Sequence, residues 1–332
     1  MAKASLDVVG IGNAIVDVLA HAEDGFLQTH GLAKGAMTLV DADAAETLYA
    51  AMGPGVEMSG GSAANTLAGL ASLGGRGAFI GKVRDDQLGA VFAHDIRAAG
   101  TSFETAFAAA GPPTARCLVL VTPDAQRTMQ TFLGAAVDLG PEDVDPAVIE
   151  SAEVTYLEGY LWDPPRAKQA FLKAAEIAHG AGRRVALSLS DPFCVERHRA
   201  EFRDLVENHV DILFANEIEI AALYETADFD AALAAVRGRC ALVALTRSEK
   251  GSVVVAGQET HAVPAAPVDR VVDTTGAGDL YAAGFLYGAV RDFTPAECAR
   301  LGGLAAAEAI SHLGARPESS LAGLVTAARR PA

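Results

Sequence analysis

Residues 273–279, DTTGAGD, place two carboxylates around a glycine turn that runs into an alanine-rich, helix-like segment. The N–H groups at a helix start are unpaired and the helix dipole is positive there, so such a turn favours an anion. Gly276 and Gly278 would let the backbone approach a ligand closely, and the N–H groups of Ala277, Gly278 and Asp279 could then face one cluster of oxygens. A carboxylate at the same place would repel a phosphate.

The second carboxylate has a chemical use if the anion is a phosphoryl group in transfer. Asp279 could then accept the proton of the attacking hydroxyl. In a loose transition state the hydroxyl loses its proton late, so an ionised carboxylate without a strongly raised pKa would suffice. The structural alternative for these residues is a helix cap preceded by a glycine turn.

A second glycine turn lies far upstream, at residues 60–65, GGSAAN. Asn65 falls on the first turn of the helix that follows, where its amide could reach a ligand hydroxyl. The alternative is a tight strand-to-helix turn with Ser62 as its cap. The turn therefore supplies a second set of candidate binding groups.

Two other nucleotide-binding motifs are absent. In residues 8–18, VVGIGNAIVDV, isoleucine occupies the third glycine position of G-x-G-x-x-G, and the residues that follow alternate instead of opening a helix. No G-x-x-x-x-G-K-[ST] sequence occurs. The pattern disfavours a dinucleotide-dependent dehydrogenase and a P-loop enzyme.

The composition limits the partners and the compartment. The 332 residues carry a net charge of −16, which disfavours a nucleic acid or an acidic membrane as partner. No apolar stretch approaches the roughly 18 residues of a membrane span. The four cysteines have no metal-site spacing and are expected to be reduced core thiols, so a cytoplasmic protein is expected.

Short apolar runs alternate with helix-like segments, which predicts an α/β domain with a mostly parallel sheet. Strands are expected at 7–12, 78–81, 154–158, 184–189, 212–215 and 241–246. Helices are expected at 63–73, 165–179, 230–237, 277–290 and 295–312.

Two segments, 14–41 and 101–134, break this alternation and are β-rich. Residues 127–133 alternate in the manner of a strand, with Arg127 and every second residue after it on one face. We expect these segments to form a small sheet over one end of the main sheet, a candidate lid on the substrate site. The predicted core then comprises residues 1–13, 42–100 and 135–332, and the lid comprises 14–41 and 101–134.

Taken together, GGSAAN and DTTGAGD resemble the paired signatures of the ribokinase-like (PfkB) carbohydrate kinase family in order and separation. NEIE at 216–219 matches the family's N-x-x-E element, which lies between the two signatures. The resemblance covers essentially the whole chain. It implies a ribokinase-like three-layer α/β/α domain with a small β-sheet lid, and transfer of the γ-phosphoryl group of ATP to a primary hydroxymethyl group.

Within the family, the adenosine kinase branch is the most similar. Its features are LSLSDPF at 187–193, VDILFANEIEIAAL at 210–223, GNAIVDV at 12–18 and the two-piece lid. The resemblance implies phosphorylation of adenosine at its 5′-hydroxyl to give AMP, a purine salvage reaction. A sugar kinase acting on a ribose- or fructose-like sugar, or a kinase of inosine or guanosine, is the alternative. A non-catalytic binding protein on the same scaffold is disfavoured, because binding needs no base at Asp279.

The resemblance assigns the phosphate side of the site. Asp279 is the base on the attacking hydroxyl, the anion hole is formed by Gly276, Ala277 and Gly278, and Arg127 closes over the phosphates from the lid. ATP and Mg²⁺ are assigned to Asn216, Glu219, Thr246 and Gly251.

One position departs from the family pattern. Thr246 and Gly251 match a T-x-G-x-x-G turn beneath ATP, but Ser248 replaces its central glycine. This substitution leaves the local geometry of the ATP site open.

On the substrate side, the resemblance assigns Asp17 to a ribose diol, since its two oxygens can accept from adjacent hydroxyls. The remaining substrate residues are Asn13, Gly61, Ser62, Asn65 and, against the nucleobase, Phe193. Asp273 and Thr275 match positions that bind a monovalent cation in several members, so potassium is a further expected ligand. The protein is expected to be a monomer or a homodimer joined through its lids.

Overall fold

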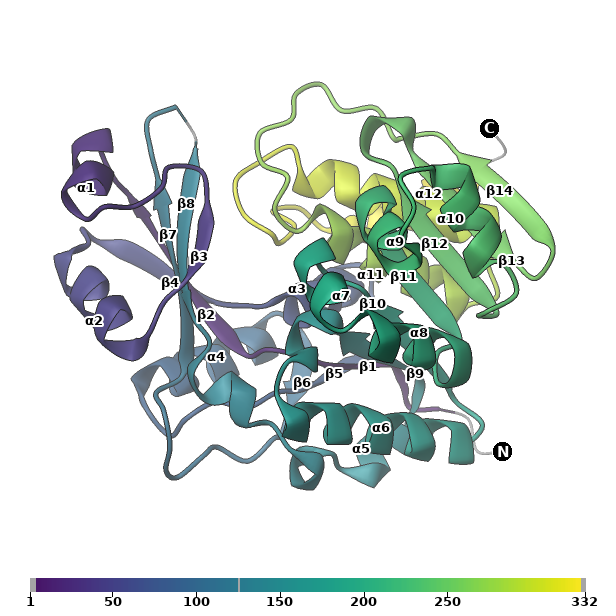
Figure 1. Ribbon diagram of the computed structural model, residues 1–332, viewed down its shortest axis with the longest axis horizontal. Helices are drawn as coiled ribbons and strands as arrows, with labels where there is room; N and C mark the ends of the chain where they lie inside the picture. The colour runs from purple at the N-terminus through teal and green to yellow at the C-terminus, as the bar shows by residue number, and fades with distance from the viewer. Residues whose placement is uncertain (1–3, 125, 330–332) are drawn as a thin grey trace.

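The computed structural model describes residues 4–124 and 126–329, which form two β-sheets and the helices around them (Figure 1). The larger sheet has nine strands in the order β14-β13-β12-β11-β10-β9-β1-β5-β6. Neighbouring strands are parallel except in the β12–β13 and β13–β14 pairs, which are antiparallel. In chain order these strands are β1 (Leu6–Ile11), β5 (Gly77–Ile80), β6 (Thr101–Phe103), β9 (Ala152–Glu158), β10 (Arg184–Ser188), β11 (Ile212–Asn216), β12 (Leu242–Thr246), β13 (Ser252–Ala256) and β14 (Glu259–Val263).

Helices cover both faces of the large sheet, because successive strand residues point to opposite sides. Val8 of β1 packs into one hydrophobic core and Val9 into the other. The Val8 side is covered by α3 (Ser62–Ser72), α4 (Gln87–Ala98), α11 (Ala277–Ala289) and α12 (Pro295–Ala309). The Val9 side is covered by α6 (Pro165–Gly180), α7 (Pro192–Arg197), α8 (Arg199–Asn208), α9 (Glu217–Tyr224) and α10 (Phe229–Val236). The predicted three-layer ribokinase-like core is confirmed.

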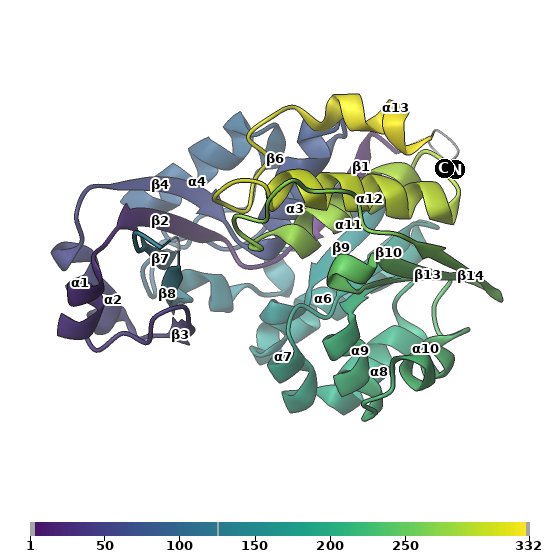
Figure 2. The same ribbon diagram turned by 90° about the horizontal axis from the view of Figure 1, so that it is seen from above.

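The smaller sheet projects from one end of this core (Figure 2). Its five strands have the order β3-β8-β7-β2-β4. They are β2 (Ile15–His21), β3 (Met37–Leu39), β4 (Gly55–Gly60), β7 (Ala115–Val121) and β8 (Arg127–Phe132), accompanied by α1 (Asp24–Thr29) and α2 (Ala42–Ala51). Arg127 and Met129 of β8 face the core, as the predicted alternation requires.

The boundaries between the two parts differ from the predicted ones. Residues 42–100 were assigned to the core, yet β4 pairs antiparallel with β2 in the small sheet. Residues 101–134 were assigned to the lid, yet β6 pairs with β5 in the large sheet. The sheet that each strand joins is set by pairing with distant segments, so the local pattern of β4 and β6 carries no mark of it. Residues 1–3 and 330–332 of the predicted core and residue 125 of the predicted lid lie outside the described residues.

Within residues 4–124 and 126–329, no helix has the length and apolar character needed to cross a bilayer.

Helices α3 and α11 approach closely because Gly69 stands at their contact. A Cβ atom on Gly69 would lie 2.5 Å from Leu280 Cδ1 and 2.9 Å from Ala283 Cβ. Both helices begin at the glycine turns singled out in the sequence. Their close packing therefore sets the distance between the two turns.

We predict that Gly69→Ala destabilises the protein by about 1–3 kcal/mol, because the added methyl group overpacks this contact. The matched control is Gly303→Ala in α12, where a Cβ would meet nothing within 4 Å. That change should stabilise the fold by about 0.4–1 kcal/mol, since alanine reduces the freedom of the unfolded chain. Urea unfolding midpoints of the two variants should move in opposite directions, and a shared direction would contradict the packing argument.

Candidate active site

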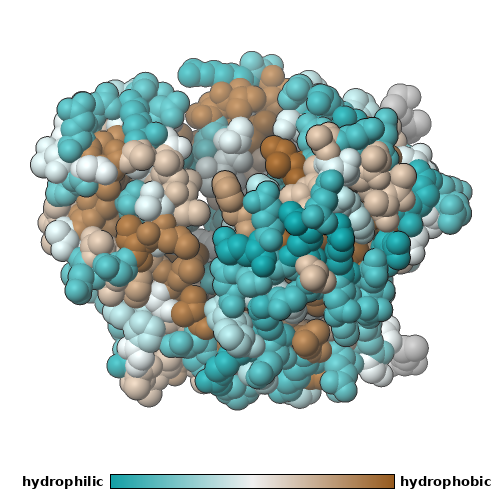
Figure 3. Space-filling model, in the orientation of Figure 1, coloured by the Kyte–Doolittle hydropathy of each residue, from teal (hydrophilic) through white to brown (hydrophobic). Residues whose placement is uncertain are grey.

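A cavity of about 780 Å³ lies between the small sheet and the carboxyl ends of the core strands. In Figure 3 the surface is hollowed between the two parts, and hydrophobic side chains gather on the flank formed by the small sheet. Of the residues proposed from the sequence, those lining the cavity are Asn13, Asp17, Gly61, Ser62, Asn65, Arg127, Phe193, Asn216, Glu219, Thr246, Thr275, Gly276, Ala277, Gly278 and Asp279. Gly251 and Asp273 do not line the cavity.

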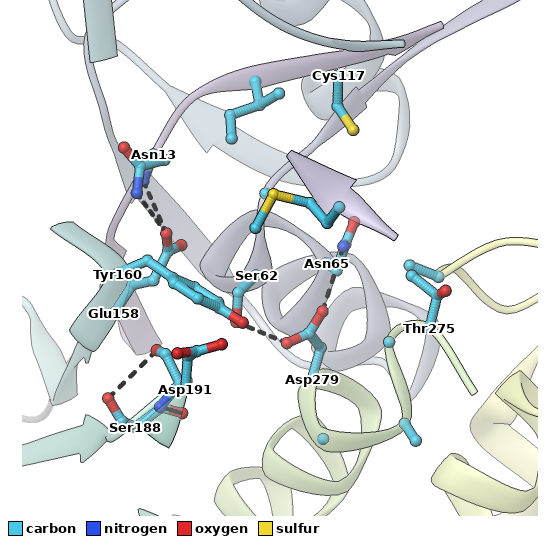
Figure 4. A pocket seen from close by; sticks show the side chains of 18 of the residues that line it. Asn13, Ser62, Asn65, Cys117, Glu158, Tyr160, Ser188, Asp191, Thr275 and Asp279 are labelled. Atoms are coloured by element: carbon cyan, nitrogen blue, oxygen red, sulfur yellow. Dashed lines mark hydrogen bonds between the residues drawn. The ribbon is translucent and has the colours of Figure 1, made fainter. Parts of the chain in front are cut away.

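Asp279 lies in the first turn of α11, and both of its carboxylate oxygens face α3 (Figure 4). Ser62 Oγ donates to Oδ1 at 2.6 Å, and Asn65 Nδ2 donates to Oδ2 at 3.2 Å. Burial raises the pKa of Asp279 to about 6, and these two hydrogen bonds limit the rise. At neutral pH the group is therefore mostly ionised, with lone pairs left for a third donor.

The turn before α11 holds the backbone amides at the cavity wall. Gly276 has φ 78°, and a Cβ atom on it would lie 2.6 Å from Ala315 Cα, so only glycine fits. The N–H of Ala277 donates to the carbonyl of Thr274 at 3.2 Å. The next amides, of Gly278 and Asp279, belong to the first helical turn and have no acceptor within the helix.

Arg127 extends from β8 to the loop before this turn. Its Nη1 lies 2.9 Å from Asp273 Oδ2, and both side chains are largely buried, with 9% and 7% exposed. Among the described residues, the buried Nε and Nη2 atoms of Arg127 have no hydrogen-bond acceptor. Nε and Nη2 form one edge of the guanidinium, which can bind an oxyanion through two parallel hydrogen bonds.

The Asp273 carboxylate is fully used by protein donors. Oδ1 accepts from the Thr275 amide at 3.0 Å and the Thr275 hydroxyl at 2.7 Å. Oδ2 accepts from the Gly314 amide at 2.9 Å in addition to Arg127. A carboxylate offers about four lone-pair positions, so this side chain has none left for the potassium ion expected of it.

Asp17 faces the cavity from β2 and has no hydrogen-bond donor among the described residues. Burial raises its pKa to about 6, the positive charges of Arg316 and Arg127 oppose the rise, and Asp279 adds to it. Gly60 gives the carboxylate room, since a Cβ there would lie 2.2 Å from Asp17 Oδ2. An ionised carboxylate without a protein donor is suited to hydroxyl groups of a ligand.

Glu158 supports the neighbouring turn from the end of β9. Its Oε1 accepts from Asn13 Nδ2 at 2.7 Å and its Oε2 from the Ala63 amide at 2.8 Å. Burial raises the pKa of Glu158 to about 7, and the bonds from Ala63 and Asn13 oppose the rise. Among the described groups, Asn13 Oδ1 is buried without a donor. Asn13 therefore keeps one acceptor for a ligand.

Asn216 and Glu219 form a reciprocal capping box at the start of α9. Asn216 Oδ1 accepts from the Ile218 and Glu219 amides, both at 2.8 Å, while Glu219 accepts from the Asn216 amide and side chain. Burial raises the pKa of Glu219 to about 7, opposed by the hydrogen bond from the Asn216 backbone. No cluster of three or more His, Cys, Asp or Glu side chains suited to a metal occurs among the described residues. Each Glu219 oxygen accepts only one hydrogen bond from the described residues and keeps a lone pair, so this carboxylate fits a magnesium ion that keeps most of its waters.

The turn after β12 contains the departure from the family pattern. Ser248 adopts φ 51°, a left-handed conformation that favours glycine. Gly251 has φ 84°, and a Cβ atom on it would lie 2.1 Å from the Val263 carbonyl oxygen. The turn therefore keeps a glycine-type backbone at position 248 despite the serine.

Phe193 lies at the cavity rim with 69% of its surface exposed, so it is placed beside the site and packs against little protein. Sequence reasoning missed Tyr160, which lines the cavity directly after β9 and is 41% exposed. It also missed Glu158, although a carboxylate at the end of a buried parallel strand lies where α/β sheets bind ligands. Arg316 was missed as well, and nothing in its loop sequence marks it.

Comparison with known proteins agrees with this architecture. A crystal structure of adenosine kinase from Sinorhizobium meliloti is 56% identical, with a TM-score of 0.90, over 98% of this chain and 100% of that one. A probable sugar kinase protein from Rhizobium etli is 50% identical, with a TM-score of 0.90, over 98% and 99% of the two chains. Adenosine kinase of Saccharomyces cerevisiae is 28% identical over 85% of this chain and 88% of its own length.

The family model described as pfkB family carbohydrate kinase matches residues 38–321, which is most of the chain. That match includes both glycine turns and the N-x-x-E element between them. Together with the two-sheet architecture, it shows that the chain belongs to the pfkB family of carbohydrate kinases.

Proposed function

We propose that this kinase transfers the γ-phosphoryl group of ATP to the 5′-hydroxyl of adenosine, forming AMP and ADP. The observation that carries the proposal is the placement of two carboxylates, Asp17 and Asp279, in one cavity with a large apolar wall. The relative at 56% identity, described as an adenosine kinase, supports this choice of acceptor.

The acceptor is held by groups that lack protein partners. Asp17 accepts hydrogen bonds from the ribose 2′- and 3′-hydroxyls, and Asn13 Oδ1 is a second free acceptor of a residue that lines the same cavity. The small sheet supplies apolar surface for a nucleobase, and Tyr160 and Phe193 add aromatic surface. The apolar residues that line the cavity from this sheet are Ile15, Leu19, Met37, Leu39, Met58, Val119 and Met129.

A free sugar is the second candidate acceptor. The Rhizobium etli protein at 50% identity is described as a probable sugar kinase. Asp17 would serve any furanose diol, so this carboxylate alone does not separate the two substrates. The apolar wall favours adenosine, because a free sugar carries hydroxyls around its ring and gains little from apolar contact.

Asp279 acts as the general base. Ser62 and Asn65 hold its carboxylate, which accepts the proton of the attacking hydroxyl as the oxygen bonds to the γ-phosphorus and the bond to the β-phosphate oxygen breaks. The free amides at the start of α11 and the unpartnered edge of Arg127 receive the charge of the phosphoryl group. Glu219, oriented by Asn216, would hold a hydrated magnesium ion, and this ion would supply positive charge to offset that of the nucleotide phosphates.

The small sheet serves as a lid. Arg127 already joins it to the core through Asp273, and closure of the apolar wall over the acceptor would exclude water that could otherwise hydrolyse ATP. ATP and adenosine are available in the cytoplasm, where we place the enzyme.

The acceptor assignment is tested by ADP release with adenosine, inosine, guanosine, ribose and fructose at equal concentrations. We expect the highest kcat/KM for adenosine, with AMP as product. A higher kcat/KM for a sugar would replace adenosine by the second candidate, while no turnover of any of them would overturn both.

We predict that Asp279→Asn lowers kcat by about 10²–10⁴-fold, the usual contribution of a general base. The amide keeps the shape of the carboxylate and can still accept from Ser62, so the fold and the binding of adenosine should persist. Asp43→Asn, in the first turn of α2 and exposed, is the matched control. Turnover of Asp279→Asn near that of the wild type in an ADP-release assay would refute the assignment.

The raised pKa values predict loss of activity in acid. Asp17 and Asp279 both have pKa values of about 6 and must both be ionised, so kcat/KM for adenosine should fall as the pH drops through this region. Below it the loss should approach about 100-fold per pH unit, tenfold for each carboxylate. In Asp17→Asn the loss of kcat/KM at low pH should decrease to about tenfold per pH unit. An unchanged slope would contradict the requirement for an ionised Asp17.

Arg127→Gln should lower kcat/KM for ATP by about 10–100-fold, because charge-assisted hydrogen bonds to phosphate are lost. Arg116→Gln is the matched control. Arg116 is a buried arginine of the same sheet, with 7% of its side chain exposed. Its Nη2 lies 2.7 Å from Glu46 Oε2, and neither residue lines the cavity. Equal losses in the two variants would mean that Arg127 acts only through the stability of the sheet.

A further inference from the structure

Arg316 lies in the loop after α12 and does not line the cavity itself, but it contacts Asn65, which does. Its guanidinium contacts three elements at once. Nε donates to Asn65 Oδ1 on α3 at 3.2 Å, Nη1 to Asp95 Oδ2 on α4 at 3.0 Å, and Nη2 to Ser59 Oγ on β4 at 2.8 Å. Only 15% of the side chain is exposed.

These contacts determine which way the Asn65 amide faces. A guanidinium has donors and no acceptor, so the atom of Asn65 that meets Arg316 must be the carbonyl oxygen. The amide nitrogen is then directed to the other side, where it donates to Asp279 Oδ2 at 3.2 Å. If the amide rotated by 180°, its oxygen would face the carboxylate and repel it.

The junction between the small sheet and the core does not depend on Arg316 alone. Asp95 Oδ2 also accepts from the backbone amide of Ser59 at 2.8 Å and from its hydroxyl at 2.6 Å. Ser59 and Asp95 therefore stay joined without the guanidinium. The contact that no other described residue replaces is the one to Asn65 Oδ1.

Arg316 also places a positive charge near Asp17. The charged and titratable groups that act on Asp17 are Arg316, Arg127 of β8 and Asp279 of α11, and Cys117 of β7 is influenced by Asp17 in turn. Of the two arginines, Arg316 has the larger effect on the Asp17 carboxylate. Its removal would favour the protonated form of that group.

We propose that Arg316 is a positioning residue for phosphoryl transfer, which aims the Asn65 amide at Asp279. This positioning needs the planar fork of arginine, whereas the effect of Arg316 on Asp17 needs only its positive charge. The proposal rests on the function proposed above.

The positioning of Asn65 and the effect of charge on Asp17 are separated by Arg316→Gln and Arg316→Lys. We expect Arg316→Gln to lower kcat by about 10–100-fold, as small misplacements of catalytic groups do, and to shift the acid limb of kcat/KM for adenosine to higher pH. Arg316→Lys should keep the acid limb near that of the wild type, since the charge remains. Its kcat should stay low, because an ammonium group does not reproduce the fork.

Arg291→Gln is the matched control for stability. Arg291 is a partly buried arginine that donates to Asp7 Oδ2 at 2.8 Å, at the opposite end of β1. If Arg291→Gln lowers kcat as much as Arg316→Gln, the effect is general and the proposal is overturned. If Arg316→Gln does not fold, Arg316→Lys decides, and a wild-type kcat in that variant would overturn the positioning role.

A measurement without acceptor or ATP distinguishes this proposal from the proposed function. The side-chain amide signals of Asn65 in a ¹⁵N correlation spectrum are identified by their loss in Asn65→Asp. They should shift in Arg316→Gln and stay unchanged in Arg291→Gln. Unchanged signals would overturn the positioning role, whereas shifted signals with no turnover of adenosine by the wild type would reject only the acceptor assignment.

Discussion

The hydrogen bonds that tie Asp279 to helix α3 are the interaction on which the whole site depends. Ser62 and Asn65 hold both oxygens of this carboxylate, so the start of α11 is fixed against the start of α3. This geometry requires the two helices to pack closely, which Gly69 permits. Two turns separated by most of the chain thereby become one wall of the cavity, with backbone amides and a carboxylate side by side.

Several carboxylates around this wall are buried and poorly solvated. Burial raises the pKa values of Asp17, Asp279, Glu158 and Glu219, because it disfavours their charged forms. Two of them, Glu158 and Glu219, hold backbone amides and shape turns. The other two retain acceptor capacity for a ligand, and a site that gathers such perturbed groups in one cavity is typical of catalysis.

Much of this arrangement was accessible from the sequence. The strands and helices of the core were predicted because a buried parallel sheet produces apolar runs, and Asp279 was predicted because a glycine turn with a carboxylate is a specific chemical pattern. The sheet membership of β4 and β6 depends on pairing between distant segments, which no local pattern encodes. The contacts of Arg316 could not be predicted for the same reason, since they form only where α3, α4 and β4 meet in the fold.

The ion pair between Arg127 and Asp273 has a consequence for the order of events in a catalytic cycle. Nη1 carries the bond to Asp273, while Nε and Nη2 form a separate edge without a protein acceptor. A phosphate can therefore bind to Arg127 without displacing the carboxylate. Because the two bonds do not compete, nucleotide can arrive or depart while the small sheet remains joined to the core. The ion pair with Asp273 and the contact with a phosphate can therefore exist at the same time.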